Sequence, residues 1–417
     1  MVSDAPAETS PSLVLGHPLL PVPKFQPEST PPVAPASTVP PPTPGQASTP
    51  ISWSPTEKVA GGGKFSLCLN NAVAGLRDEF NCFHLVWAQD DKLWYGRLIA
   101  RSDHWATSAL PRFGTTGSVL FPTLARAGHT LFAAWIEDQQ LIVARSDNLG
   151  DTWQAPLRLA GNVSSLSIAA LDPPTHIPAL VVAWTDSQKN RSFLSSWQGR
   201  QWTASDFISP VSLATGTSPA QDPCVTSNRD LFCVAWRDLR AGSERIYYRY
   251  SSDYGAVWSA DKPAPYRGDT VTAVIGGSPS LNLADDGTLY LAYQRGLISV
   301  LLYCRLGQDA FSQLGVLGSG AHPQVAANRY GDVAAGWERP ELEPDGKRST
   351  YIGLSVYLNR GAIYVGPNAM PEAGVALGRD QPLVSMTDRY LDIVWLDGRE
   401  NATYLAHRAA ILNSTGR

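Results

Sequence analysis

The chain has 417 residues, of which 17% are charged and 43% hydrophobic, with 35 Gly, 33 Pro and 13 Trp. This length allows a large closed β-fold, and the net charge of −4 argues against a nucleic-acid partner. No run approaches the roughly 20 apolar residues of a membrane span. The stretch Ser12–Leu20 is interrupted by Gly16 and Pro18 and lacks a basic flank, so we expect no signal peptide there.

Residues 1–50 differ in composition from the rest of the chain. Of the 33 prolines, 15 precede residue 56, and Pro40–Pro44 is almost continuous. Such a segment cannot form strand ladders, so it predicts an extended, disordered tail. The tail is either a flexible leader or a docking segment for a partner, and both interpretations remain open.

Residues 51–417 contain one template seven times. Each copy has an apolar strand, a polar turn, a second strand ending in an aromatic residue and an acidic turn, then two more strands. The second-strand aromatics are Trp87, Trp135, Trp184, Trp236, Tyr293, Trp337 and Trp395. Their spacing matches four-stranded propeller blades. The sequence therefore predicts an all-β propeller of seven four-stranded antiparallel blades, with six as the alternative count.

The last copy, Gln381–Arg408, lacks its fourth strand. Ser52–Gly61 resembles the fourth strand Thr152–Gly161, because both begin with a hydroxyl residue and Trp and end in Ala-Gly. A ring of blades must close, since open edges invite aggregation. We therefore expect residues 51–61 to complete the last blade from the N-terminal side.

Two polar turns repeat a short motif between the third and fourth strands. One reads Ser251-x-Asp253-x-Gly255-x-x-Trp258, and the other has Ser146, Asn148, Gly150 and Trp153. The side chains can close a tight turn and Gly can take the positive φ that it needs. Ser195–Trp202 and Tyr357–Tyr364 keep only the Gly and a terminal aromatic.

These motifs resemble the Asp boxes, or BNR repeats, of sialidases and other β-propellers. The resemblance covers residues 52–410 and implies that the boxes lie on the face opposite the ligand site. The site face would then carry the turns after the second strands and the residues that begin the first strands. The turns contain Asp90, Asp138, Asp186, Arg237, Asp238, Arg240, Glu338, Arg339, Asp397 and Arg399, and the strand beginnings contain Asp222, Ser278, His322, Arg379 and Asp380.

Sialidases, as a family, hold a substrate carboxylate with three arginines, the first in an Arg-Ile-Pro motif on the first inner strand. We expect that strand at Phe65–Leu69, which has no Arg, and no Arg-Ile-Pro occurs in the chain. The weak catalytic candidates are Asp222, Asp238, Asp380 and Asp397, which could supply a carboxylate pair. The ligand-binding candidates are Arg237, Arg240, His322, Arg379 and Arg399. Trp-x-Asp-x-Arg occurs twice, which is more typical of a turn-stabilising role than of catalysis.

The five cysteines leave the redox compartment open. Cys224 and Cys233 would face each other if Asn228-Arg229 were a two-residue turn, and Cys68 and Cys82 flank the corresponding hairpin of the first blade. Two disulfides would suit an extracellular protein, but Cys also serves as a small core residue. No cluster of His or Cys predicts a metal site, and we expect no cofactor.

The sequence favours a non-catalytic binding or scaffold propeller, outside the cytoplasm or at the cell surface, with a glycan or protein ligand. A sialidase-like or other exo-glycoside hydrolase is the alternative. A third hypothesis is a structural subunit that docks into an assembly through its Pro-rich tail.

Overall fold

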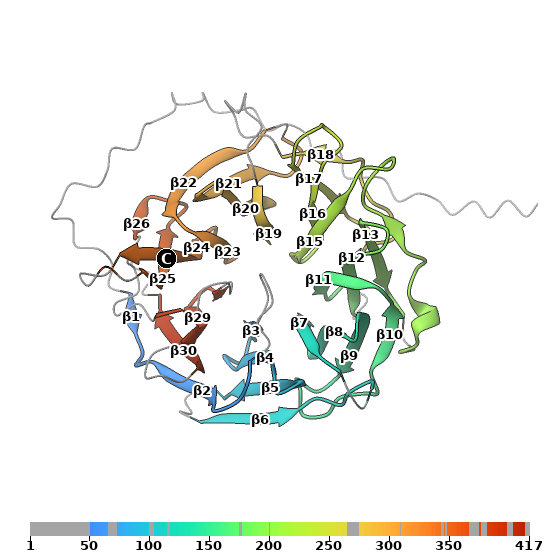
Figure 1. The fold of residues 1–417 in the computed structure, drawn as a ribbon, viewed down its shortest axis with the longest axis horizontal. Helices are drawn as coiled ribbons and strands as arrows, with labels where there is room; N and C mark the ends of the chain where they lie inside the picture. The colour runs from blue at the N-terminus through green and yellow to red at the C-terminus, as the bar shows by residue number, and fades with distance from the viewer. Residues whose placement is uncertain are drawn as a thin grey trace, which may run out of the picture. The chain divides into compact units, whose positions relative to one another are not determined.

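The chain folds as a seven-bladed β-propeller in the computed structural model (Figure 1). The structure describes residues 51–65, 73–99, 104–114, 117–174, 177–199, 201–264, 275–308, 310–342, 346, 348–366, 375–376, 382–397 and 403–412. Seven antiparallel blades surround a central channel, and β3, β7, β11, β15, β19, β23 and β28 are their innermost strands. The predicted fold class and the count of seven blades are confirmed. The predicted tail, residues 1–50, lies outside the described residues and stays a prediction.

The strand bounds follow the predicted repeat. Blades 1 and 2 contain β3 Val73–Arg77, β4 Phe83–Gln89, β5 Lys92–Leu98 and β6 Trp105–Ala109, then β7 Val119–Ala127, β8 Thr130–Glu137, β9 Gln140–Ser146 and β10 Leu157–Ala160. Blades 3 and 4 contain β11 Val163–Leu171, β12 Ala179–Asp186, β13 Arg191–Trp197 and β14 Val211–Ser212, then β15 Ala220–Ser227, β16 Phe232–Asp238, β17 Arg245–Ser251 and β18 Lys262–Pro263. A short 3-10 helix, Ala204–Asp206, precedes β14.

The remaining blades complete the ring. Blade 5 contains β19 Ile275–Leu283, β20 Thr288–Arg295, β21 Ile298–Arg305 and β22 Ser312–Ser319, and blade 6 contains β23 Ala321–Ala327, β24 Val333–Leu342, β25 Arg348–Leu358 and β26 Ile363–Val365. Blade 7 contains β28 Leu383–Met386, β29 Tyr390–Asp397 and β30 Tyr404–Ile411. The short strand β27 Val375–Ala376 pairs with both β25 and β29 and joins blades 6 and 7 into one sheet.

Blade 7 is closed by the N-terminal segment, as predicted. Two short strands, β1 Ser52–Trp53 and β2 Glu57–Gly61, pair antiparallel with β30. Trp53 lies opposite Ala410, and Glu57 lies opposite His407. The outer edge of β30 is thereby covered, and the two ends of the described chain share one blade (Figure 1).

The first blade begins later than predicted. Its inner strand is β3, Val73–Arg77, whereas Phe65 makes only an isolated bridge to Gln89. The strand that takes the inner position is therefore β3 and not the predicted Phe65–Leu69, of which Ser66–Leu69 lie outside the described residues. A side chain at Gly75 would come within 2.7 Å of the His84 carbonyl oxygen and 3.0 Å of Leu383, so this strand needs Gly where it passes blade 7. The glycine required at this position interrupts the run of apolar residues by which an inner strand is recognised in the sequence.

The core lies between successive blades. The second strands are buried along their whole length in blades 1, 2 and 3, and the second-strand tryptophans are among the largest fully buried side chains, namely Trp87, Trp135, Trp236 and Trp337. Because each second strand is covered on both faces, it reads as a continuous apolar run, which explains why these strands were the easiest to locate in the sequence.

The two Ser-x-Asp/Asn turns have the same hydrogen bonds. The Ser146 hydroxyl donates to Asn148 Oδ1 at 2.9 Å and accepts from the Gly150 amide at 2.8 Å. Ser251 makes the same pair with Asp253 and Gly255, at 2.7 and 2.9 Å. Both turns join a third strand to a fourth, so the antiparallel order places them on the face opposite the turns that follow the second strands. We call the latter the upper face and that of the Ser-x-Asp/Asn turns the lower face.

Candidate functional site: the upper end of the central channel

The acidic residues that follow the second-strand tryptophans cap the indole rings. The indole Nε1 of Trp236 donates to Asp238 at 3.0 Å, and that of Trp395 donates to Asp397 at 3.1 Å. Both carboxylates belong to residues at most 1% exposed. Gln89 and Glu137 accept from the preceding tryptophans in the same way, each at 3.1 Å. A buried indole N–H requires an acceptor, so a Trp-x-acid repeat stabilises the blades.

Asp238 also anchors Arg240 in blade 4. Burial alone would raise the pKa of this carboxyl, but hydrogen bonds from the Arg240 side chain, Trp236 Nε1 and the Arg240 amide outweigh it and lower the pKa. Arg240 in turn pairs with Asp261, which also binds Arg249, and its guanidinium lies 4.2 Å from the centre of the Tyr247 ring. These groups form one ionic network. Within it the Asp238 carboxylate is surrounded by its own partners and is not accessible to a ligand.

The cap predicts a measurable loss of stability. Asp238→Ala leaves the Trp236 N–H buried without its acceptor, so we expect a loss of about 1–3 kcal/mol in unfolding free energy. Asp238→Asn keeps an acceptor oxygen and should cost less. Glu244→Gln is the control, because Glu244 is a partly exposed partner of Arg237 (29% side-chain exposure) and such pairs contribute about 0–1 kcal/mol. Urea unfolding measures all three, and equal effects of Asp238→Ala and Glu244→Gln would refute the cap.

A second feature of the upper face is a strained bulge at the start of the inner strands. Phe121, Asp222 and His322 have φ of 51°, 51° and 50°, and each precedes a proline. The strand register shifts at all three positions. Positive φ is rare in ordinary residues, and proline further restricts the residue before it. A bulge redirects a side chain, and here the same strain recurs with three different side chains.

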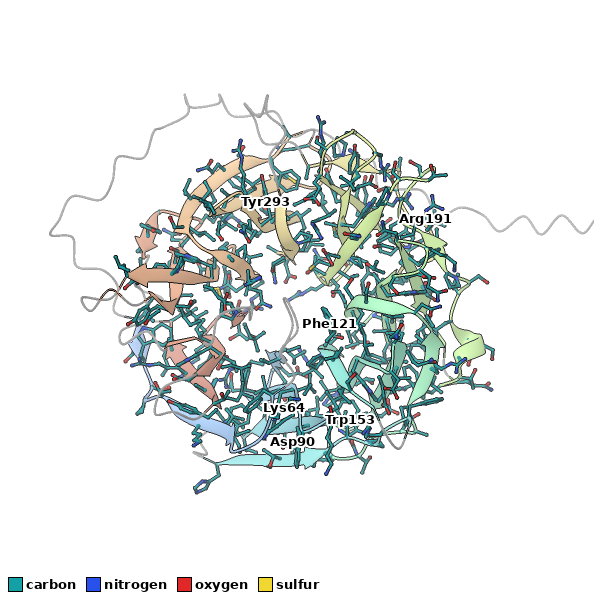
Figure 2. The ribbon with its side chains drawn as sticks, in the orientation of Figure 1. Lys64, Asp90, Phe121, Trp153, Arg191 and Tyr293 are labelled. Carbon is teal, nitrogen blue, oxygen red and sulfur yellow. The ribbon has the colours of Figure 1, made fainter. Side chains whose placement is uncertain are left out.

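Two of these bulges, at Phe121 and Asp222, border a cavity of about 270 Å³ in the central channel. Figure 2 shows Phe121 beside the channel, at the inner end of blade 2. Phe121 and Asp222 line the cavity, together with polar groups of the inner strands, Thr123, Ser165, Ser280, Asn282 and Gln324. Among the described residues that line it, Asp222 is the one carboxylate.

Part of the polar lining joins successive blades. The Val225 amide donates to Ser167 Oγ at 3.0 Å, the Val325 amide donates to Ser280 Oγ at 3.1 Å, and the Val384 amide donates to Gln324 Oε1 at 2.6 Å. Each bond runs from the inner strand of one blade to the inner strand of the preceding blade. Ser167, Ser280 and Gln324 therefore help to hold neighbouring blades together.

The structure brings some predicted site residues together and separates others. Asp222 lies at the cavity and binds Arg237, with Nε at 2.8 Å from Oδ2, and Arg237 also pairs with Glu244 at 3.1 Å. His322 lies at the matching bulge of blade 6, with Nδ1 2.8 Å from Glu338 Oε2. Asp238, Arg240 and Asp397 belong to the capping contacts. Arg379, Asp380 and Arg399 lie outside the described residues.

Phe121, Asn282 and Gln324 also line the cavity and were not among the predicted site residues. The signal that would have found Phe121 is the repeated X-Pro pair, which starts the inner strands at Phe121-Pro122, Asp222-Pro223, Ser278-Pro279, His322-Pro323 and Gln381-Pro382. In the sequence this pair marks only where an inner strand begins, and the structure shows the positive φ that accompanies it at Phe121, Asp222 and His322.

The cysteine hairpin of blade 4 differs from the two-residue turn considered above. Its loop spans 228–231, so Cys224 lies opposite Ala235 and Cys233 lies opposite Thr226. Cys82, Cys224, Cys233 and Cys304 are free thiols, and Cys68 lies outside the described residues. Burial raises the pKa of Cys224 to about 11 and that of Cys233 well above its usual value. Cys224 and Cys233 thus act as core residues between blades 4 and 5.

Two absences concern only the part of the chain that the structure describes. No group of three or more His, Cys, Asp or Glu side chains there is arranged to hold a metal ion. No helix within those residues has the length and apolar character that crossing a membrane requires.

The fold and the channel define a seven-bladed β-propeller with a small polar cavity at its axis. No family model and no curated protein matches the sequence. Among solved structures, an α-L-arabinanase of Penicillium chrysogenum complexed with arabinobiose is 13% identical, with a TM-score of 0.49 over 72% of this chain and 98% of that one. AofleA of Arthrobotrys oligospora is 10% identical, with a TM-score of 0.45 over 77% and 90%. A Trypanosoma rangeli sialidase in complex with the inhibitor DANA is 12% identical, with a TM-score of 0.45 over 84% and 59%. Similarity at this level does not bear on activity.

Proposed function

We propose that this protein is a non-catalytic binding propeller, acting outside the cytoplasm, which holds a glycan at the upper end of its channel. The observation that supports this is the strained bulge of Phe121 and Asp222 at the cavity, a geometry that recurs at His322 in blade 6. Backbone strain of this kind clusters at functional sites. The bulge has the same backbone geometry in these blades but a different side chain in each. The acids that cap the indole rings, in contrast, are similar from blade to blade because they stabilise the fold.

The chemistry at the channel suits a sugar better than a protein surface. A cavity of about 270 Å³ admits only a small group. Phe121 offers an apolar ring face, and Asp222, which Arg237 holds in place through an ion pair, offers a carboxylate that accepts hydrogen bonds. A protein ligand would have to insert one side chain and is the second possibility.

Binding of the full-length protein to a glycan array tests this function. Asp222→Asn should weaken binding by about tenfold or more, because it removes a charged hydrogen-bond partner, and Asn tolerates the positive φ of the bulge. Phe121→Ala should also weaken binding. Asp147→Asn is the matched control, since Asp147 is a partly exposed acid of the lower face. Silence on the array, or binding insensitive to Asp222→Asn and Phe121→Ala, would refute the glycan site.

A hydrolase of the sialidase-like or another exo-glycosidase type is the alternative. Asp222 is the candidate acid that lines the cavity, while Asp238 and Asp397 are engaged by indole rings. Turnover of a fluorogenic glycoside panel that Asp222→Asn abolishes would establish this alternative. Co-purification of a partner that requires residues 1–50 would instead favour a docked assembly subunit.

A further inference from the structure

A second pocket lies on the lower face, and it arises where one turn of the repeat fails to close. In blades 2 and 4 the Ser-x-Asp/Asn turn is fastened to the preceding blade. The Tyr95 hydroxyl donates to the Leu149 carbonyl at 3.0 Å, and the Ser196 hydroxyl donates to the Gly255 carbonyl at 2.9 Å. A side chain at Gly150 would fall 2.1 Å from the Tyr95 oxygen. These turns therefore seal the gap between neighbouring blades.

The residue before the turn glycine supplies an apolar plug in those blades. Leu149 packs into the cluster between blades 1 and 2, and Tyr254 packs into the cluster between blades 3 and 4. Both have positive φ, 52° and 63°, and both are followed by a glycine at 89°. The conformation holds the plug against the preceding blade.

The turn of blade 6 keeps this backbone and loses the plug. Arg360 and Gly361 have φ of 55° and 89°, which match Leu149 and Gly150. However, the Arg360 side chain is 73% exposed, and a side chain at Gly361 would meet only Leu314, at 3.7 Å. Tyr357 stands where the other turns have their serine, so the Ser hydroxyl bonds cannot form.

The result is a pocket of about 340 Å³ between blades 5 and 6, within the range of roughly 300–1,000 Å³ that small-ligand sites occupy. Blade 5 contributes one face of β20 and β21, on which Thr288 lies opposite Arg305 and Tyr290 lies opposite Tyr303. Blade 6 contributes Tyr357 and Arg360.

The lining combines aromatic rings with an excess of positive charge. Burial raises the pKa of Tyr290 to about 12 and also raises that of Tyr357, so both hydroxyls stay protonated. The Tyr290 hydroxyl donates to the Gly331 carbonyl at 3.5 Å, so it can accept a hydrogen bond from a ligand. The Tyr303 ring is 38% exposed. Asp286 reaches Arg360 only at 3.7 Å, and among the described residues the Arg305 guanidinium forms no ion pair. A guanidinium can bind a carboxylate or sulfate through two parallel hydrogen bonds.

We propose that this pocket binds an anionic monosaccharide, one whose ring carries a carboxylate or a sulfate group. Arg305 and Arg360 hold the anionic group, the Tyr303 ring lies against the sugar, and Asp286, Thr288 and the tyrosine hydroxyls bind the sugar hydroxyls. The site is separate from the channel, since it lies on the lower face and between two blades.

Titration of the full-length protein with glucuronate, glucose 6-sulfate and glucose, followed by ligand-observed NMR, tests the proposal. We expect saturable binding of at least one anionic sugar and about tenfold weaker binding of neutral glucose. Glucuronate and glucose 6-sulfate distinguish a carboxylate from a sulfate ligand. Equal binding of glucose, or no saturable binding of any of the three, would overturn the proposal.

Two variants locate the site. Arg305→Gln should weaken anionic binding by about tenfold. Arg360→Leu restores the plug of Leu149 and should abolish binding, while the melting temperature stays unchanged because Arg360 is exposed. Asp222→Asn should leave this binding intact, which separates the pocket from the proposed channel site. Binding that survives Arg360→Leu but is lost in Asp222→Asn would place the ligand in the channel and refute the second site.

Discussion

Deletion of residues 51–62 is expected to lower the melting temperature by about 10 °C or more. β1 and β2 cover the outer edge of β30, and Trp53 and Val59 pack against the cores of blade 7 and of the blade 7–blade 1 junction. A fully buried apolar side chain contributes about 1.5–3 kcal/mol, of which the half-buried Trp53 and Val59 each supply a part in addition to the strand hydrogen bonds. Each kcal/mol corresponds to about 2–4 °C in a domain of 150–250 residues. The deletion also exposes an unpaired strand edge, which favours aggregation.

Deletion of residues 1–46 is the matched control for this experiment. It removes a longer piece of the same end of the chain and retains β1 and β2. Differential scanning calorimetry of the two truncated proteins and the wild type should show a large shift for the first deletion and none for the second. Equal melting temperatures of wild type and the 51–62 deletion would refute the role of this segment in closure.

Asp392→Asn is expected to cost about 3–5 kcal/mol of unfolding free energy. Asp392 is 0% exposed, and it binds Arg77 Nε at 2.8 Å and His407 Nε2 at 3.0 Å. His407 Nδ1 in turn lies 3.3 Å from Glu57 Oε2. This chain of charges links blade 1, blade 7 and the closing strand β2. Removing one charge of a buried pair leaves the others uncompensated, which is why the cost is large.

Asp388→Asn is the control for the buried cluster. Asp388 belongs to the same blade and pairs with Arg329, but both side chains are partly exposed, at 35% and 48%. Exposed pairs contribute about 0–1 kcal/mol, so this substitution should have little effect. Chemical denaturation of both variants gives the comparison, and a loss below 1 kcal/mol for Asp392→Asn would contradict the proposed contribution of the cluster.

The same cluster predicts how closure depends on pH. Burial alone would lower the pKa of His407, but hydrogen bonds to Asp392 and Glu57 outweigh it and raise the pKa above 6.5. A raised histidine pKa contributes stability that is complete below about pH 6.5 and is lost as the pH rises through the folded-state value. Burial also opposes the ionised forms of Asp392 and Glu57, yet their hydrogen-bond partners outweigh burial and lower both pKa values. The stability that these two carboxylates contribute is therefore lost as the solution becomes acidic.

The cluster should therefore stabilise the ring most between about pH 5 and 6.5. The difference in unfolding free energy between wild type and His407→Gln should be larger at pH 6 than at pH 9. Denaturation curves at the two pH values test this, and a difference that grows with pH would show that His407 is buried in its neutral form.

The fold class and the closing segment could be predicted from the sequence, which also favoured seven blades over six. These follow from repeated local patterns, since Trp87, Trp135, Trp236 and Trp395 mark second strands that are buried on both faces. The similarity of Ser52–Gly61 to a fourth strand was enough to predict which segment closes the ring. The first inner strand was misplaced because Gly75, required by its contact with blade 7, interrupts the apolar pattern.

Only the tertiary structure decided which polar residues are available to a ligand. Asp222 and Asp238 look alike along the chain, but one lies at the channel on a strained bulge and the other caps a buried indole ring. The lower pocket depends on whether Arg360 fills the space that Leu149 and Tyr254 fill elsewhere. Such differences arise from contacts between blades about 50 residues apart, and a local pattern contains no information about partners at that distance.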